Sequence, residues 1–289
     1  MARPRSASTE STCRPTTNIH ELEGHTVNKV HSSDGTAIAF DRLGNGPPVV
    51  LVCGASTDRM ANAPLARLLA ERFTVFNYDR RGRGDSDDTA PYAVEREVED
   101  IGAVIDVAGG SVFVYGTSPG AAVALEAAAS GLTITKLALW EPPFILDESR
   151  RPPADLVERY DQMILAGRRG DAVEYFMTKV VGLPPDFVAY ARTQPFWQAQ
   201  EALAHTLAYD ATVMGDYSLP VERVAEVTIP TLVMAGGASF PFIRETARVL
   251  ADILPDGQHR TLEGQEHNVD PAVLTPVLVD FFKIQDGTP

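Results

Sequence analysis

The sequence predicts an α/β protein built on a mostly parallel, doubly wound sheet with a helical insert. Two observations predict this fold class. Short continuous apolar runs, such as residues 48–54, alternate with segments of helical periodicity, such as residues 94–105; such runs are typical of strands covered on both faces. The alternation then stops, and only helix-like patterns occupy residues 142–227. Strands that alternate with helices are expected to form right-handed crossovers in a mostly parallel sheet.

The first half of the chain contains the clearest elements. Two β-type runs, residues 25–31 and 36–41, are joined by Ser32-Ser-Asp-Gly35, a turn sequence typical of a hairpin. After them, continuous apolar runs predict buried strands, and apolar positions that recur every three or four residues predict amphipathic helices. The predicted strands are 48–54, 73–79, 112–116 and 136–141, and the predicted helices are 61–73, 94–105 and 121–130.

The second half predicts an insert followed by a return to alternation. Helix-like segments occupy residues 155–167, 171–181 and 201–215, and then come a strand at 231–236, a helix around 242–253, a strand at 258–264 and a last helix at 273–282. A helical insert in such a sheet usually stands over the carboxyl ends of the strands, where ligands bind. We therefore predict a core of residues 25–141 and 228–289, with residues 142–227 as a helical cap, or lid.

Composition excludes several functional classes. The chain has 289 residues and a formal net charge of −14, which argues against nucleic acid or an anionic membrane as partner. Residues 1–24 are polar and rich in serine and threonine, lack the apolar middle of a secretion signal, and predict a disordered tail. No apolar run reaches membrane-spanning length. The two cysteines, Cys13 and Cys53, make a structural disulfide unexpected and favour a cytoplasmic location.

The pattern Gly116-x-Ser118-x-Gly120 lies between a predicted strand and a predicted helix. In that context it presents a serine on a tight turn as a nucleophile. The alternative is that Ser118 only caps the helix, with Pro119 at the first helical position.

Here the chain resembles the α/β-hydrolase fold family, over roughly residues 25–285. The resemblance is carried by Asp79-Arg-Arg-Gly-Arg-Gly-Asp-Ser86, by Gly116-Thr-Ser-Pro-Gly120, by the insert after Trp140-Glu-Pro-Pro143, and by the late loop that holds His267. It implies Ser118 as nucleophile and His267 as general base, because a hydroxyl needs an adjacent imidazole to take its proton. The alternative for His267 is a solvent-facing loop histidine.

The third member of the triad departs from the common family pattern. The aspartate expected after the strand at 231–236 is replaced by Ser239. Some family members place the acid one strand earlier, and Glu141 stands there, at the end of the strand next to that of the nucleophile. We predict Glu141 as the acid that orients His267, with Asp210 as a distant second candidate.

The resemblance also locates the groups that would bind the oxyanion. One backbone N–H is expected from Ala55, after Cys53 and Gly54, but the second would come from Pro119, which has no N–H. Losing one such donor costs roughly 10²–10³ in rate, so slow or unusual catalysis is expected. Apolar residues of the insert, including Trp197 and Phe196, are expected to line the substrate pocket, or alternatively to form the insert's own core.

These features predict a serine hydrolase that acts on a small ester, thioester or lactone with a largely apolar body. Two alternatives stay open: a non-hydrolytic enzyme (lyase, isomerase or cyclase) that uses the same pocket, and a catalytically silent ligand-binding protein. The expected partner is a small-molecule substrate, and a homodimer stays open. The sequence contains no metal-binding or cofactor motif, so we expect neither.

Overall fold

The computed structural model describes residues 27–283. The tail predicted at residues 1–24 lies outside the described residues. Within them, no helix is both long enough and apolar enough to cross a membrane.

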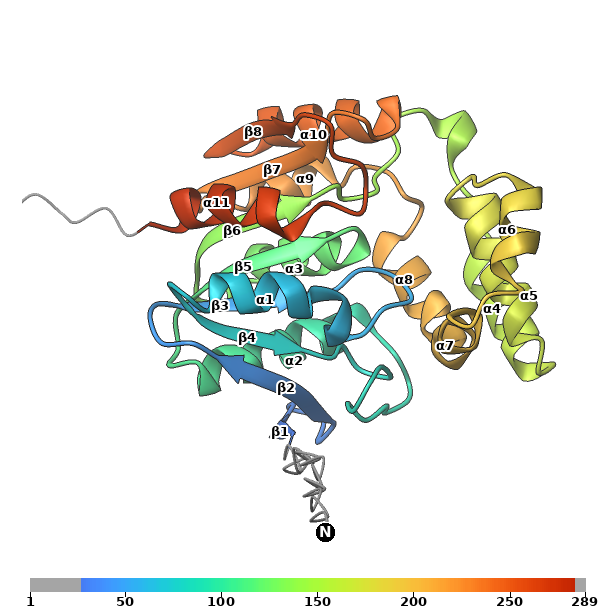
Figure 1. The fold of residues 1–289 in the computed structure, drawn as a ribbon, viewed down its shortest axis with the longest axis horizontal. Helices are drawn as coiled ribbons and strands as arrows, with labels where there is room; N and C mark the ends of the chain where they lie inside the picture. Colours follow the sequence, from blue (N-terminus) through green and yellow to red (C-terminus); the bar gives the residue numbers. More distant parts are fainter. Residues whose placement is uncertain (1–26, 284–289) are drawn as a thin grey trace, which may run out of the picture.

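A single eight-stranded sheet forms the centre of the molecule, with the strand order β1-β2-β4-β3-β5-β6-β7-β8 (Figure 1). The first two strands are antiparallel to their neighbours, and all later pairs are parallel. The mostly parallel sheet predicted from the alternation of elements is thereby confirmed. The strands are β1 Asn28–His31, β2 Ala37–Leu43, β3 Pro48–Val52, β4 Thr74–Tyr78, β5 Val112–Thr117, β6 Ile134–Trp140, β7 Thr231–Gly236 and β8 Gly257–Leu262.

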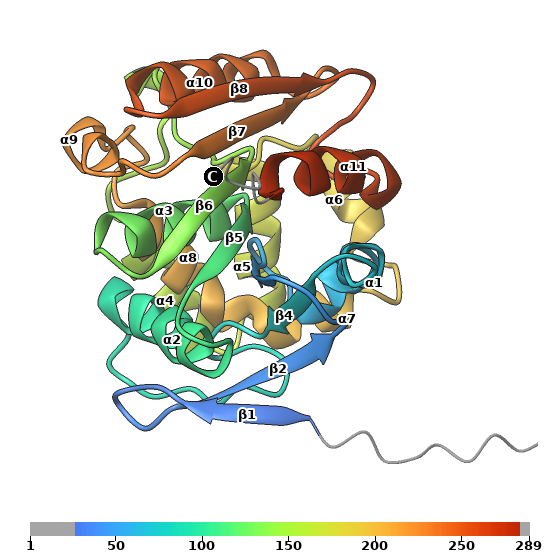
Figure 2. The same ribbon diagram turned by 90° about the vertical axis from the view of Figure 1, so that its left-hand side faces the viewer.

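Helices cover both faces of the sheet (Figure 2). One face packs against α1 Ala63–Leu69 and α11 Pro271–Phe282, through a core that includes Leu69, Leu278 and Phe282. The other face packs against α2 Val94–Val107, α3 Pro119–Ala129 and α10 Pro241–Ile253. The central strands are therefore buried on both sides, which explains their continuous apolar sequences. The helix predicted at 61–73 is shorter than expected at both ends: residues 59–62 form the 3-10 helix η1 Arg59–Asn62, and α1 ends at Leu69, before a turn at residues 70–73.

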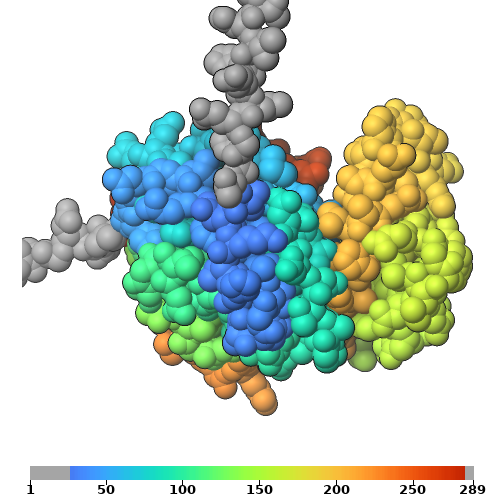
Figure 3. All heavy atoms as spheres, turned by 90° about the horizontal axis from the view of Figure 1, so that it is seen from below, coloured from blue at the N-terminus to red at the C-terminus, as the bar shows by residue number. Residues whose placement is uncertain are grey.

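The insert forms a helical lobe beside the carboxyl ends of the parallel strands (Figure 1). In Figure 3 the lobe, coloured yellow-green to yellow, stands out beside the rest of the molecule. Its last helix, α8, contacts α3 and α2 of the sheet domain. The next helix, α9 Val221–Ala225, falls within the predicted insert of residues 142–227, but it packs against α3 and α10, with the helices that cover the sheet, and not with the lobe. The elements of the lobe are η2 Glu148–Arg150, α4 Leu156–Leu165, α5 Arg169–Tyr175, the π-helix η3 Phe176–Val180, α6 Pro185–Ala191, α7 Trp197–Leu203, η4 Ala204–Thr206 and α8 Leu207–Met214.

Candidate active site

Ser118 occupies a strained turn between β5 and α3. Its backbone has φ 55° and ψ −133°, a conformation that side-chain-bearing residues rarely adopt and that is typical of functional turns. The two glycines of the motif make the turn possible. A Cβ on Gly120 would lie 2.2 Å from the Cys53 carbonyl oxygen, and one on Gly116 would lie 2.6 Å from the Gly120 carbonyl oxygen. The turn therefore sits directly against the end of β3.

The Ser118 side chain faces a histidine rather than the helix below it. Ser118 is the N-cap residue of α3, yet its side chain makes no capping hydrogen bond. Its Oγ lies 3.2 Å from Nε2 of His267. This is hydrogen-bond distance, so the capping alternative does not describe the side chain.

His267 lies in the loop between β8 and α11 and is held from two sides. Its Nδ1 is 2.6 Å from Oε2 of Glu141. Its backbone carbonyl accepts a hydrogen bond of 2.8 Å from Nε1 of Trp140, the last residue of β6. Trp140 and Glu141 are adjacent, so the end of one strand fixes both the backbone and the ring of His267.

Glu141 is fully buried and hydrogen bonded through both carboxylate oxygens. Oε1 accepts the Gly236 N–H at 2.7 Å, and Oε2 faces His267. Its own N–H donates to the Met234 carbonyl at 3.0 Å, and its φ is 47°. Burial raises the pKa of Glu141, but hydrogen bonds, first among them that of His267, outweigh the burial and hold the pKa below its ordinary value. The carboxylate is therefore ready to stabilise a positively charged imidazole.

Two other positions bear on the choice of the acid: Ser239, where the family commonly has an aspartate, and Asp210, the second candidate. Ser239 follows β7 and is buried beside Gly236: a Cβ on that glycine would lie 2.8 Å from the Ser239 Oγ. A small residue thus stands where the family commonly has an aspartate, next to the carboxylate of Glu141. Asp210, on α8, accepts hydrogen bonds from Arg80 at 2.8 Å and Arg83 at 2.7 Å. Its carboxylate is engaged by arginines.

Gly54 and Ala55 lie beside the serine at the end of β3. A Cβ on Gly54 would lie 3.3 Å from Cβ of Ser118, and Ala55 lines the same cavity as Ser118. Pro119 is buried as the first residue of α3 and supplies no N–H. Cys53 is fully buried, its Sγ donates to the Thr57 carbonyl at 3.4 Å, and it is not among the residues that line the cavity.

A cavity of about 440 Å³ opens over Ser118 and His267, between the sheet domain and the insert. That volume lies within the usual range for a small-molecule site. Its lining is mostly apolar, and its charged members are acidic. Besides Ser118, His267, Glu141, Ala55 and Pro119, the lining consists of Pro143, Ile145, Phe176, Val180, Val181, Leu183, Asp210, Met214, Tyr217, Ala238, Ser239, Phe240, Phe242, Ile243, Glu266 and Asn268.

Two predicted pocket residues lie elsewhere. Trp197 is buried in the core of the insert, and its Nε1 donates to Oε1 of Glu201 at 2.8 Å. Phe196, its neighbour, is 51% exposed. Neither lines the cavity over Ser118, and the prediction of substrate contact is wrong for both. Apolar periodicity shows that a helix buries one face, but it does not say whether that face meets the insert's own core or a cavity.

One wall of the cavity consists of residues that were not predicted to line it. Phe240 and Phe242, which follow β7 in the chain, line it. So do Met214, the last residue of α8, and Tyr217, which follows that helix. The position of residues 238–243 at the carboxyl end of a parallel strand was a usable signal for the first pair. No local pattern marks the second pair.

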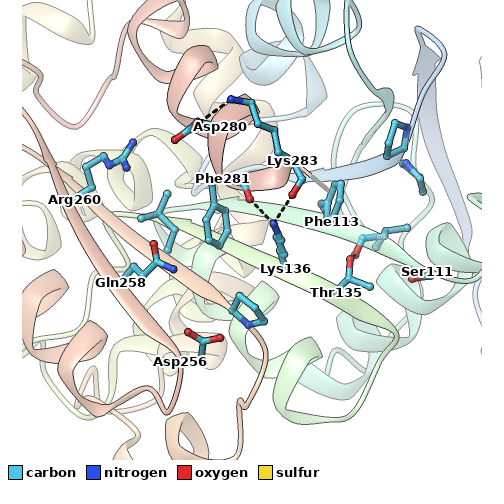
Figure 4. A pocket seen from close by; sticks show the side chains of 15 residues that line it. Ser111, Phe113, Thr135, Lys136, Asp256, Gln258, Arg260, Asp280, Phe281 and Lys283 are labelled. Atoms are coloured by element: carbon cyan, nitrogen blue, oxygen red, sulfur yellow. Dashed lines mark hydrogen bonds and ion pairs between the residues drawn. The ribbon is translucent and has the colours of Figure 1, made fainter. Parts of the chain in front are cut away.

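A larger hollow of about 920 Å³ lies at the opposite, amino ends of the strands (Figure 4). Lys136 crosses it and donates to the carbonyls of Phe281 and Lys283, both at 2.7 Å. Among the described residues that line this hollow there is no histidine, and Ser118 is not one of them. We therefore assign the chemistry to the smaller cavity. Across residues 27–283, no three His, Cys, Asp or Glu side chains gather so as to hold a metal ion.

A family model described as the alpha/beta hydrolase family matches residues 49–273. The chain belongs to this family. A crystal structure of an alpha/beta hydrolase from Sphaerobacter thermophilus DSM 20745 is 58% identical, covers 89% of this chain and 100% of its own, and has a TM-score of 0.84. Other members of the family that resemble the chain are named as hydrolases, esterases and lactonases.

Two named enzymes illustrate the range of these relatives. The 2-(acetamidomethylene)succinate hydrolase of Mesorhizobium japonicum is 25% identical over 248 residues, which are 82% of this chain and 88% of the relative. The enol-lactonase from Burkholderia xenovorans LB400 is 20% identical, with a TM-score of 0.66 over 88% of this chain and 99% of its own. At 20% identity, the similarity to the enol-lactonase shows a shared fold alone.

Proposed function

We propose that the protein is a serine hydrolase that cleaves a small, uncharged ester, thioester or lactone with a largely apolar body. One observation carries the proposal: Ser118 Oγ lies 3.2 Å from His267 Nε2, and His267 Nδ1 lies 2.6 Å from Glu141. A serine, a base within reach and an acid that orients the base are the parts of a nucleophilic triad.

In the proposed reaction, Ser118 Oγ attacks the carbonyl carbon while His267 Nε2 takes its proton. The carbonyl oxygen becomes an oxyanion, which the Ala55 N–H binds. When the intermediate collapses, the bond to the leaving oxygen or sulfur breaks, and His267 gives it the proton. Water, deprotonated by His267, then attacks the acyl–serine ester. The bond between the acyl carbon and Ser118 Oγ breaks, His267 returns the proton to Ser118 Oγ, and the acid is released. Glu141 stabilises the positively charged imidazole in both halves.

The charges around the cavity support an uncharged substrate. Glu266 belongs to the lining, and no lysine or arginine within residues 27–283 does. Asp210 also lines the cavity, but its charge is paired with Arg80 and Arg83. A substrate carboxylate would lose its hydration without gaining a cationic partner, which is unfavourable. The relative from Mesorhizobium japonicum is named for a succinate, a dicarboxylate. We therefore propose that this chain does not share that relative's substrate.

The experiment compares two p-nitrophenyl esters of similar length, the uncharged butyrate and the singly charged succinate monoester. We expect kcat/KM for the butyrate to exceed that for the succinate by at least about 10-fold, because an unpaired buried carboxylate costs more than ~1.4 kcal/mol. Ser118→Ala should lower butyrate turnover by about 10⁴-fold or more. Equal or better turnover of the succinate would contradict the charge assignment. Full activity of Ser118→Ala would contradict the nucleophile.

A non-hydrolytic reaction is the second candidate, and Pro119 is the observation that favours it. A site with one backbone donor in place of two is less suited to an acyl-transfer oxyanion, whereas proton transfer between His267 and a bound substrate needs no oxyanion hole. Wild-type protein that turns over neither ester would favour this candidate. Turnover that depends on Ser118 would exclude it.

A further inference from the structure

A buried arginine, Arg83, is hydrogen bonded to the carbonyl of the peptide group between Gly54 and Ala55. The Gly54 carbonyl accepts hydrogen bonds from Nη1 of Arg83 and from Oγ1 of Thr57, the latter at 3.1 Å. The same Nη1 also donates to the Thr57 carbonyl at 3.2 Å. Arg83 thus binds both ends of the short loop that contains Ala55.

Because a peptide group is planar, fixing the Gly54 carbonyl also fixes the direction of the Ala55 N–H, the proposed oxyanion donor. The Gly54 C=O and the Ala55 N–H belong to one planar, trans amide, so they point in opposite directions. With the carbonyl fixed on Arg83, the N–H is directed away from it. Gly54 lies beside Ser118, since a Cβ on Gly54 would be 3.3 Å from the Ser118 Cβ.

The surroundings make this hydrogen bond strong. The Arg83 side chain is 1% exposed, and its charge is balanced by Asp210 Oδ1 at 2.7 Å. Hydrogen bonds from a charged donor are about twice as strong as neutral ones. In a buried site a bond to the carbonyl also polarises the amide, and strengthens the hydrogen bond made by its N–H by about 10–30%.

We propose that Arg83 is a positioning residue for catalysis: it holds and polarises the Gly54–Ala55 amide, so that the Ala55 N–H offsets part of the donor that Pro119 lacks. Arg83 does not touch substrate. Asp210, on α8 of the insert, holds Arg83 in place and so links the insert to the oxyanion loop. This inference rests on the proposed hydrolase function.

Arg81 provides a matched control. It is as buried as Arg83 and forms ion pairs with Asp100 at 2.7 Å and Asp34 at 2.9 Å. Its hydrogen bonds go to those carboxylates and to the Arg96 carbonyl, away from the loop at residues 53–57. Loss of Arg81 therefore removes a comparable buried arginine without freeing the Gly54 carbonyl.

The experiment measures kcat and KM for p-nitrophenyl butyrate, together with inhibition by a trifluoromethyl ketone, whose adduct with serine carries an oxyanion. We expect Arg83→Met to lower kcat by about 10- to 100-fold, less than the loss of a whole oxyanion donor, with KM changed less than about three-fold. Affinity for the ketone should fall by the same factor as kcat/KM. Arg81→Met should leave both kcat/KM and the affinity for the ketone unchanged.

A second variant keeps the test decisive if Arg83→Met folds poorly. Arg83→Lys retains a cation that can bond the carbonyl and should recover part of kcat and of the ketone affinity. Wild-type protein without ester turnover would overturn both this inference and the proposed function. Wild-type turnover, with Arg83→Met and Arg81→Met equal in kcat and in ketone affinity, would overturn the role of Arg83 alone.

Discussion

Ser118 and Glu141 share a backbone conformation that is rare for residues with a side chain, with φ 55° and 47°. Each directly follows a parallel strand, β5 or β6, and these strands are neighbours in the sheet. Ser118 N–H donates to the Trp140 carbonyl at 2.8 Å, so the two turns are also hydrogen bonded to each other. Such strain persists only where surrounding contacts enforce it, and here it aims a hydroxyl and a carboxylate at opposite sides of one imidazole.

The role of Glu141 is tested by Glu141→Gln, which keeps the shape but removes the charge. Without the carboxylate, the imidazole loses both its preferred tautomer and the stabilisation of its charged form, so kcat should fall by about 10³–10⁴-fold. Glu266→Gln is the control, because Glu266 precedes His267 and lines the same cavity. It should keep kcat within about three-fold. Steady-state kinetics on p-nitrophenyl butyrate measure both variants, and equal kcat values would contradict the assignment of the acid.

The turn between β5 and α3 depends on close packing of α3 against β3. Gly120 lies in the first turn of α3, where a Cβ would meet the Cys53 carbonyl oxygen at 2.2 Å and the Val52 carbonyl oxygen at 2.8 Å. These are backbone atoms at the end of a central strand, and they cannot move aside without shifting the strand. Close packing also explains the alanine-rich sequence of α3. Six of its eleven residues are alanines, whose small side chains let the helix lie close to the sheet and to the other helices that bury it.

Gly120→Ala should therefore destabilise the fold and displace Ser118, while an equivalent change in α2 should not. Apart from its chain neighbours and the backbone of its own helix, a Cβ on Gly102 would have one atom of residues 27–283 within 4 Å, Cδ2 of Leu132 at 3.7 Å. We expect Gly120→Ala to lower the free energy of unfolding by about 1–3 kcal/mol, as overpacking does. Gly102→Ala should raise it by about 0.5–1 kcal/mol through helix propensity. Urea denaturation measures both, and unchanged stability of Gly120→Ala would contradict the packing described.

Across the molecule, the arginines of the turn at residues 79–86 join distant parts of the chain. Arg80 bonds Glu97 of α2 and Asp210 of α8, while Arg81 bonds Asp100 of α2 and Asp34 after β1. Burial raises the pKa of Glu97, but Arg80 outweighs this and leaves the pKa of that carboxyl below its ordinary value. These ion pairs join the turn to the insert through Arg80 and to the hairpin through Arg81.

The sequence predicted the fold, and three candidate site residues that the structure brings together, because each had a local signature. Buried parallel strands appear in the sequence as continuous apolar runs. Ser118 lies in a strand-turn-helix motif. His267 and Glu141 each follow a predicted strand, and the carboxyl ends of these strands meet at one edge of the sheet. Asp210 and Arg83 are 127 positions apart, and no local pattern brings them together. Trp197 and Phe196 were misplaced because helical periodicity does not distinguish an insert's core from a cavity wall.

The central claim is that Ser118 is the group that His267 activates, and a fluorophosphonate tests it directly. The wild-type protein should gain the mass of one phosphonyl group per chain, located on Ser118 by peptide mass spectrometry. Ser239→Ala, which alters another serine of the same cavity, should label as the wild type does, and His267→Ala should label at least about 10²-fold more slowly. No adduct on the wild type, or an adduct on a residue other than Ser118, would contradict the account.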